Sequence, residues 1–302
     1  MLRRLFQVAE SIFDREFAAI GLTMAQYDVL LALASVSGLD QSALARVLGL
    51  DPSNAAAVVS RLLKRGLINR QRHPSDRRKV VLALSKSGRD ALRGAEERAI
   101  TVSRLFVAPA EPAEAPVLRS LLSTIAHQNV DMAAPWAPVA RDERSCKTAL
   151  YRRYEDPCFL VRRAYQVASA MFNEASVELD ITSRQFAMLT AIASRPGIDQ
   201  ITLAGIGGSD RSTTALVVSN LEASRLIKRN PDPEDRRRWL LTASPAGIDA
   251  WKKVSKLGEG VQERLLSPFT PRQRRRFAEL LEKLLATHNA HVRAPLYEKP
   301  KR

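Results

Sequence analysis

The sequence contains little cysteine and no long apolar run. Only two of its 302 residues are cysteines, Cys146 and Cys158, so neither a disulfide framework nor a zinc site built from thiolates is indicated. No apolar stretch reaches the ~18 residues that are needed to span a bilayer. The first residues carry charges throughout and lack the apolar core of a secretion signal. These absences predict a cytoplasmic protein that does not enter a membrane.

Acidic residues are scarce relative to basic ones. The 32 Asp and Glu residues are outnumbered by 47 Lys and Arg residues, which gives a formal net charge of +15. The electrostatic field of such a charge attracts polyanions, of which nucleic acid is the first candidate and an anionic membrane surface the second. A basic surface can also serve solubility alone. No glycine-rich phosphate loop, Ser/His/Asp array or paired-carboxylate motif stands out, so neither an enzyme nor a bound cofactor is predicted.

What the sequence does contain is one long segment that occurs twice. The stretch from Asp51 to Leu92 is similar to the stretch from Asp210 to Trp251, and the two align without a gap at an offset of 159 residues. Solenoid repeats run about 20–50 residues, so this longer period indicates a duplicated domain. We predict domains at residues 1–132 and 159–294, a Pro-rich and then charged linker at 133–158, and a tail at 295–302.

Each copy has the pattern of a helix-turn-helix followed by a basic hairpin. In the first copy a short helix over 41–48 and a capped helix from Pro52 to about Arg65 precede two short strands. This winged helix would place its second helix in a DNA major groove and the hairpin tip in a minor groove. Flanking helices are expected over 2–20, 24–35, 85–106 and 118–132, so the fold class is mainly α (an α+β winged helix), with two such domains in tandem.

The candidate DNA contacts are polar or basic residues on the second helix and at the hairpin tip. Asp76 and Asp235 precede the tip arginines and are expected to order the wings, and one arginine of each pair could instead bond this neighbouring aspartate. Arg61 on the first copy is replaced by Asn220 on the second, which predicts two unequal half-sites in the DNA. The candidates are Ser53, Asn54, Arg61, Arg77 and Arg78 in the first copy, and Arg211, Ser212, Thr213, Thr214, Asn220, Arg236 and Arg237 in the second.

These motifs resemble those of the MarR family of transcription regulators. The resemblance implies paired winged helices that join through their first, fifth and sixth helices, bind pseudo-palindromic double-stranded DNA and, in many members, release it on binding a small aromatic acid. Applied to one chain with two copies, it implies a monomeric pseudo-dimer with a shared helical region, acting as a repressor. The residues that carry it are Leu44-Ala45, Gly49, Asp51-x-Ser53, Asp76-Arg77-Arg78 and Ser85-x-x-Gly88, and Asp210, Asp235-Arg236-Arg237 and Gly247 in the second copy.

The resemblance also implies an effector pocket between the helical region and the winged helix. Candidate lining residues are Phe13, Tyr27, Phe172, Phe186 and Trp251, for which ordinary core packing is the alternative. 

Three further features allow more than one interpretation. Cys158 lies near the position of the reactive cysteine in the organic-hydroperoxide sensors of the family, but an incidental structural cysteine is favoured. His288 and His291 have helical i, i+3 spacing without a third ligand nearby in sequence, so no metal site is predicted. The glycines Gly205, Gly207 and Gly208 predict a second helix-turn-helix that is looser or that binds DNA more weakly.

Two alternative functions remain. The first is a winged-helix pair that contacts proteins and binds DNA only weakly and non-specifically. The second is an enzyme with an unfamiliar site, which no motif in the sequence supports.

Overall fold

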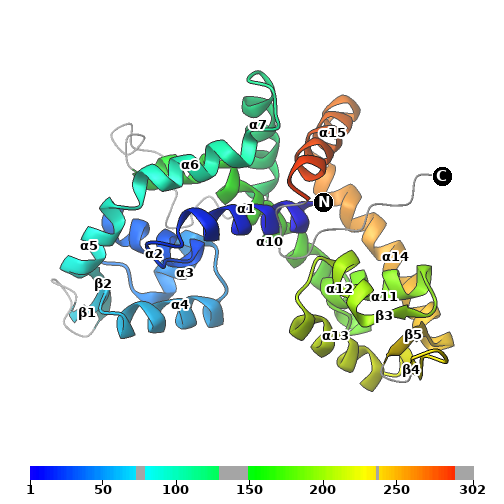
Figure 1. The fold of residues 1–302 in the computed structure, drawn as a ribbon. Helices are drawn as coiled ribbons and strands as arrows, with labels where there is room; N and C mark the ends of the chain where they lie inside the picture. Colours follow the sequence, from blue (N-terminus) through cyan, green and yellow to red (C-terminus); the bar gives the residue numbers. More distant parts are fainter. Residues whose placement is uncertain (73–78, 129–148, 236–237, 290–302) are drawn as a thin grey trace. The chain divides into compact units, whose positions relative to one another are not determined.

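The computed structural model describes residues 1–72, 79–128, 149–235 and 238–289, which form two compact units (Figure 1). The first unit comprises residues 2–164 and the second residues 165–302. The boundary between them falls inside helix α10 (Pro157–Ala175), a few residues after the predicted start of the second repeat. Among the described residues, none of the helices combines the length and the hydropathy that a membrane-spanning segment requires.

The first unit is centred on α2 (Met24–Ser35). This helix begins with a capping box, in which Thr23 Oγ1 accepts a hydrogen bond from Gln26 N and Gln26 Oε1 accepts one from Thr23 N, at 3.3 and 3.1 Å. Leu30 of α2 is fully buried and belongs to a core that includes Leu44 and Leu62. The other elements are α1 (Leu2–Glu16), α3 (Gln41–Leu48), α4 (Pro52–Lys64), β1 (Ile68–Arg72), β2 (Val80–Leu84), α5 (Lys86–Arg93), α6 (Glu96–Val107), α7 (Glu114–Ala126) and α9 (Ala149–Tyr154).

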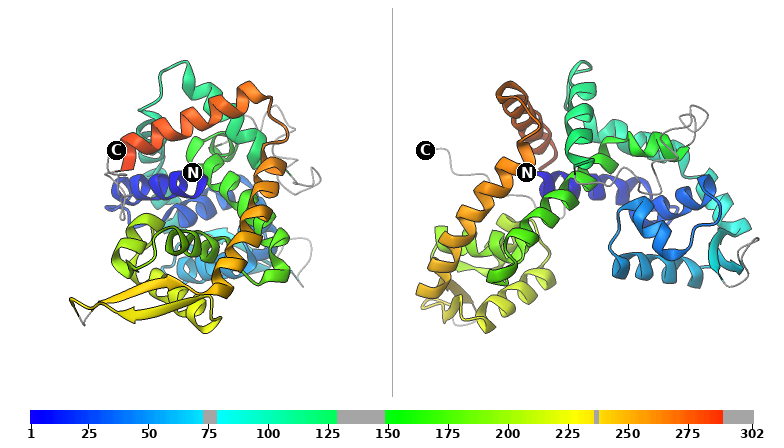
Figure 2. Two further views of the ribbon diagram at one scale, coloured as in Figure 1. Left: turned by 90° about the vertical axis from the view of Figure 1, so that its right-hand side faces the viewer. Right: turned by 180° about the vertical axis from the view of Figure 1, so that it is seen from behind.

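The second unit repeats this order around α11 (Ser183–Ser194). Thr182 and Gln185 form the same capping box, and Met188, Leu189 and Ile192 of α11 are fully buried in the core. The hairpin of this unit extends beyond its helices (Figure 2). The remaining elements are η2 (Val177–Leu179), β3 (Ile198–Asp199), α12 (Gln200–Gly207), α13 (Arg211–Ala223), β4 (Ile227–Pro231), β5 (Trp239–Ala243), α14 (Pro245–Leu266) and α15 (Pro271–His288).

The two hairpins pair in the same register. Ile68 lies opposite Leu84 in the first antiparallel pair, and Ile227 lies opposite Ala243 in the second, which are the same positions after the repeat offset. In the second unit β3 adds a further strand beside β5. The sequence pattern did not reveal β3, because two residues are too few to show a period-2 alternation.

The prediction of one continuous helix over 85–106 is wrong. The structure has two helices there, α5 and α6, which are separated around Gly94. The second copy has Lys253 at the corresponding position, and its α14 runs for 22 residues without a break. Gly94 stays in the right-handed region, with φ −70° and ψ −11°, and its N–H donates to Asp90 O and Leu92 O, so the interruption is local to one turn.

Candidate nucleic-acid interface

The second helices of the two helix-turn-helix units, α4 and α13, begin in the same way. Asp51 Oδ1 accepts a hydrogen bond from Asn54 N, and Asp210 Oδ1 accepts one from Thr213 N, both over 2.8 Å. The Ser212 hydroxyl also donates to Asp210, at 2.6 Å, and this bond is the main cause of the lowered pKa of Asp210. Each helix therefore starts from an aspartate cap whose position is set by its own first turn.

Most of the predicted contacts on these helices face solvent. The opposite face of α4 packs Val58, Val59 and Leu62 into the core, as the sequence pattern predicts. Thr214 is the exception, because it is fully buried and its hydroxyl donates to Asp210 O over 2.8 Å, so it lies away from the surface that DNA would meet. The exposed candidates are Ser53, Asn54 and Arg61 on α4 and Arg211, Ser212 and Asn220 on α13, with Thr213 half-buried.

The predicted wing-tip residues Asp76, Arg77, Arg78, Arg236 and Arg237 lie outside the described residues. The base of the second wing is described, and Arg238 ties it to the helix-turn-helix. Its Nη2 lies 3.0 Å from Asp199 Oδ2, which belongs to the residue that caps α12. 

The same arginine closes the base of the turn through its backbone, because its N–H donates to Asp235 O over 2.8 Å. Burial would raise the pKa of Asp199, but the hydrogen bonds from Thr202, Ile201 and Arg238 outweigh it and lower that pKa. Sequence reasoning missed Asp199 and Arg238, although both carried a signal: Asp199 precedes a short helix, and Arg238 is the third arginine of its run.

The motif serine and glycine after each hairpin anchor the wing to the next helix. Ser85 Oγ accepts from Gly88 N and donates to Gly66 O, and Ser244 Oγ makes the corresponding bonds in the second unit. A Cβ atom on Gly88 would lie 2.0 Å from Leu67 O, and one on Gly247 would lie 1.9 Å from Leu226 O. These glycines are thus required by the close approach of helix and strand at the root of each wing.

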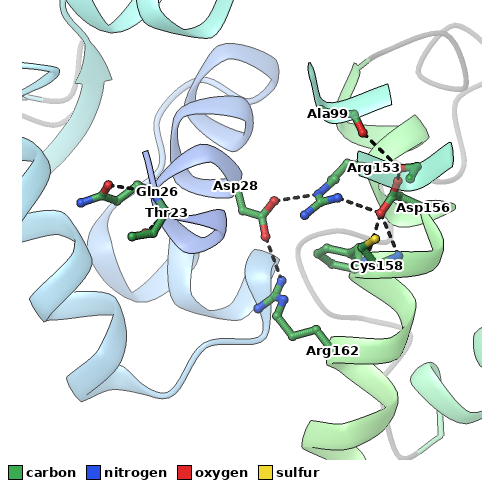
Figure 3. A network of polar contacts seen from close by, with 10 residues as sticks. Thr23, Gln26, Asp28, Ala99, Arg153, Asp156, Cys158 and Arg162 are labelled. Atoms are coloured by element: carbon green, nitrogen blue, oxygen red, sulfur yellow. Dashed lines mark hydrogen bonds and ion pairs between the residues drawn. The ribbon is translucent and has the colours of Figure 1, made fainter. Parts of the chain in front are cut away.

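A buried ionic cluster lies against α2 of the first winged helix (Figure 3). Asp28 of α2 lies between two arginines: its Oδ1 is 2.7 Å from Arg153 Nε, and its Oδ2 is 3.3 Å from Arg162 Nη2. Arg153 Nη1 also lies 2.7 Å from Asp156 Oδ1, and Asp156 caps the start of α10 by accepting from Cys158 N. The end of the predicted linker is therefore folded onto the first unit.

The same segment reaches the turn of the first helix-turn-helix. Tyr154 donates its hydroxyl to Val47 O over 3.1 Å, and Arg163 Nη1 donates to Gly49 O over 3.4 Å. Gly49 has a φ of 60°, in the left-handed region, and ends α3. Residues at the end of the predicted linker and at the start of the second repeat thus contact the turn between α3 and α4. 

The second repeat has Ala187 where the first copy has Asp28, so its central helix carries no carboxylate at this position.

Burial sets the protonation of this cluster. It would lower the pKa of Arg153, but Asp28 and Asp156 raise that pKa above its ordinary value. It lowers the pKa of Arg162 to about 10 and raises that of Asp156. Burial also raises the pKa of Cys158 well above its ordinary value, so this residue is a thiol at neutral pH and lacks the thiolate that a peroxide sensor needs.

The effector candidates fall in different places. Phe13 stacks on Phe17 in the core at a centroid distance of 3.7 Å, while Tyr27 beside them lines an open pocket of about 200 Å³ with Arg152 and Arg153. In the second unit Phe172 stacks on Phe186 at 5.4 Å within a buried cluster, and Trp251 packs against the core around Met188. 

The described ranges contain no group of three or more His, Cys, Asp and Glu side chains placed to hold a metal ion. His288 is buried in α15, and His291 lies outside those ranges.

Two acid-capped helices with solvent-facing polar sides, each followed by an anchored hairpin, define a winged helix-turn-helix protein of the DNA-binding class. The sequence model of the MarR family matches residues 22–80 and 181–239. The chain therefore belongs to the MarR family of DNA-binding transcription regulators and carries the unit of that family twice.

Relatives match this chain over about one copy. The transcriptional regulator HosA of Escherichia coli O111:H- is 29% identical over 106 residues, which cover 35% of this chain and 78% of HosA. The transcriptional repressor NicR of Pseudomonas putida is 31% identical over 33% of this chain and 68% of NicR. The crystal structure of the PcaV regulator from Streptomyces coelicolor with its natural ligand aligns at a TM-score of 0.41 and 32% identity, covering 43% of this chain and 92% of PcaV.

Proposed function

We propose that this chain is a sequence-specific transcription repressor that binds one DNA operator with both of its winged helices. The observation that carries the proposal is the duplication of the winged helix-turn-helix, which we call the reading unit and which runs from α3 to β2 in the first copy and from α12 to β5 in the second. The helices α4 and α13 have the same aspartate cap, and the wings have the same Ser–Gly anchor. The net charge of +15 suits a polyanionic partner. The name of NicR, a transcriptional repressor, supports repression rather than activation.

The chain acts as a monomeric pseudo-dimer in this proposal. Joining the two reading units makes the second half-site encounter intramolecular, at an effective concentration of order mM, so that no second subunit needs to assemble. The duplication supports it, because each unit of the single chain has its own aspartate-capped second helix and its own hairpin.

The two half-sites of the operator differ in sequence. α4 exposes Arg61 and Lys64 near its end, where α13 exposes Asn220 and Ala223. A guanidinium and an ammonium group favour phosphates and guanine edges, whereas an amide favours adenine. At the wing tips Arg78 and Arg237 enter the flanking minor grooves in this proposal, where the negative potential is strong.

A small aromatic acid releases the DNA in the second part of the proposal. The pocket beside Tyr27 offers an aromatic wall, the Ser103 hydroxyl and the Arg153 guanidinium, whose Nη2 has no hydrogen-bond partner within the described chain. Because α2, α9 and the residue before α10 line this pocket, an acid bound there would disturb the segment that contacts the turn between α3 and α4. Titration of the DNA complex with hydroxylated benzoic acids, for the wild type and Arg152→Ala, tests this part.

Selection of duplexes from a random library by the full-length protein tests the main proposal. The selected operator should bind one chain per duplex by light scattering, with an affinity that falls steeply between about 50 and 200 mM salt. Arg78→Ala and Arg237→Ala should each weaken binding and reduce the salt slope by about one. Arg119→Ala, an exposed arginine on α7 outside both reading units, is the matched control and should bind as the wild type does.

Two results would contradict the proposal in different ways. Two chains on one operator would refute the monomeric pseudo-dimer but leave a DNA-binding regulator. Weak, salt-insensitive binding without an enriched sequence would favour the protein-contact alternative.

A further inference from the structure

The helix α13 carries a large apolar side chain in the middle of its solvent-facing side. Leu216 is 63% exposed, while its neighbours Val217 and Val218 are buried in the core of the second unit. Leu216 follows Ser212 by four residues and precedes Asn220 by four, so the three side chains lie on one face of the helix. This is the face from which we propose that the second unit reads DNA.

The first unit differs at this position. Its α4 has Ala57 where α13 has Leu216, and Ala57 is also exposed. Leucine has three more carbon atoms than alanine and reaches two bonds further from the backbone. The core does not require Leu216, because Val217, Val218 and Leu221 fill the buried side of α13. Isolated exposed leucines are common on protein surfaces, so it is the placement between two polar side chains of a recognition face that gives this one a function.

Base edges in the major groove offer one apolar group to such a side chain. Adenine, guanine and cytosine present hydrogen-bond donors and acceptors there, whereas thymine also presents its 5-methyl group. We propose that Leu216 is a specificity-determining residue of the second unit, which selects thymine in its half-site by packing on this methyl group. The proposal rests on the proposed function, and it assigns a methyl-dependent step to the half-site of α13 that Ala57 is too short to give the half-site of α4.

Uracil provides the sharpest test, because it pairs as thymine does and lacks only the 5-methyl group. The operator selected by the full-length protein is resynthesised with uracil in place of each thymine, one position at a time, and binding is measured by fluorescence anisotropy for the wild type and Leu216→Ala. One thymine in one half-site should lose about fourfold in affinity with the wild type, the loss expected for one buried carbon. With Leu216→Ala the same replacement should change nothing.

Two controls separate methyl recognition from general damage. Ser219→Ala alters an exposed neighbour on the same helix and should keep the uracil effect at full size. The thermal unfolding of Leu216→Ala should match that of the wild type, because the side chain is removed from solvent and not from the core.

The outcomes are distinct. A uracil effect that survives in Leu216→Ala, or an operator without any uracil-sensitive thymine, would overturn this inference and leave the proposed function standing. Failure to enrich any duplex would overturn both and would assign the exposed leucine to a protein contact.

Discussion

Arg153 Nε donates to Asp28 Oδ1 over 2.7 Å, between residues that are 125 positions apart in the sequence. The two side chains are only 4% and 1% exposed, so the pair is shielded from solvent and from salt. It joins α9, which lies within the predicted linker, to α2, the central helix of the first winged helix. A buried ion pair of this kind contributes little net stability while intact, but it becomes costly when one partner is removed.

Asp28→Ala should therefore destabilise the first unit strongly. The substitution leaves Arg153 with its pair to Asp156 and removes the ion pair of Arg162, and the free energy of unfolding should fall by about 3–5 kcal/mol. Calorimetric unfolding of the full-length chain measures it. Glu155→Ala is the control, since its exposed pair with Arg119 spans 4.0 Å and should matter by less than about 1 kcal/mol. 

Replacing both arginines with methionine and Asp156 with asparagine beside Asp28→Ala removes every charge of the cluster and should restore most of the loss. If this quadruple variant is as unstable as Asp28→Ala alone, uncompensated charge is not the cause.

Cys158 should be inert in the folded protein. Because burial raises the pKa of its thiol, the thiolate is scarce at neutral pH, and the sulfur is also out of reach of solvent. In a Cys146→Ser background we expect alkylation by iodoacetamide at pH 8 to be at least about 100-fold slower than in urea, since it must wait for unfolding. Rapid reaction of the native protein with an organic hydroperoxide would contradict this and would restore the sensor interpretation.

Alanine should not be tolerated at the motif glycines. Gly88→Ala and Gly247→Ala each place a methyl group about 2 Å from a backbone carbonyl oxygen, so each should lower the unfolding free energy by roughly 1–3 kcal/mol. Gly260→Ala, within α14 and with open space around it, should instead raise stability by up to about 1 kcal/mol. Melting temperatures of the three variants decide this, and equal behaviour at all three positions would show that close approach is not what requires the glycines.

Arg225 occupies a position that favours glycine. It has a φ of 58°, in the left-handed region, at the end of α13, where the first copy has Gly66 with a φ of 67°. Non-glycine residues pay about 1–2 kcal/mol for this conformation, and the greater freedom of glycine in the unfolded chain offsets part of the gain. Arg225→Gly should raise the stability of the second unit by up to about 1 kcal/mol, and Gly66→Ala should lower that of the first. Chemical denaturation followed by domain-resolved hydrogen exchange distinguishes the two effects.

Much of the fold is predictable from the sequence because its signals are local. The caps at Thr23, Asp51 and Ser85 bond to backbone groups three residues away, so a few consecutive residues are enough to predict them. The wings follow from short apolar strands around a charged turn. The break at Gly94 was missed, because one glycine in a helical pattern is compatible with either a continuous or an interrupted helix.

The candidate interface was predictable in its location but not in each residue. Ser53, Asn54 and Arg61 are exposed as expected, because they lie opposite a clear apolar stripe. Thr214 is buried and Leu216 is exposed, the reverse of what their polarity suggests. Polarity alone could not decide this, since the orientation of a helix is fixed by the side chains it packs against.

The sequence by itself determined that one reading unit occurs twice, and where each helix of that unit begins. Those facts depend on periodicity and on bonds that close within one helical turn. Only the tertiary structure decided that α9 and the start of α10 pack against α2 through Asp28, and that Cys158 is buried there. Such contacts join residues more than a hundred positions apart, and the burial that gives them their strength exists only once the chain has folded.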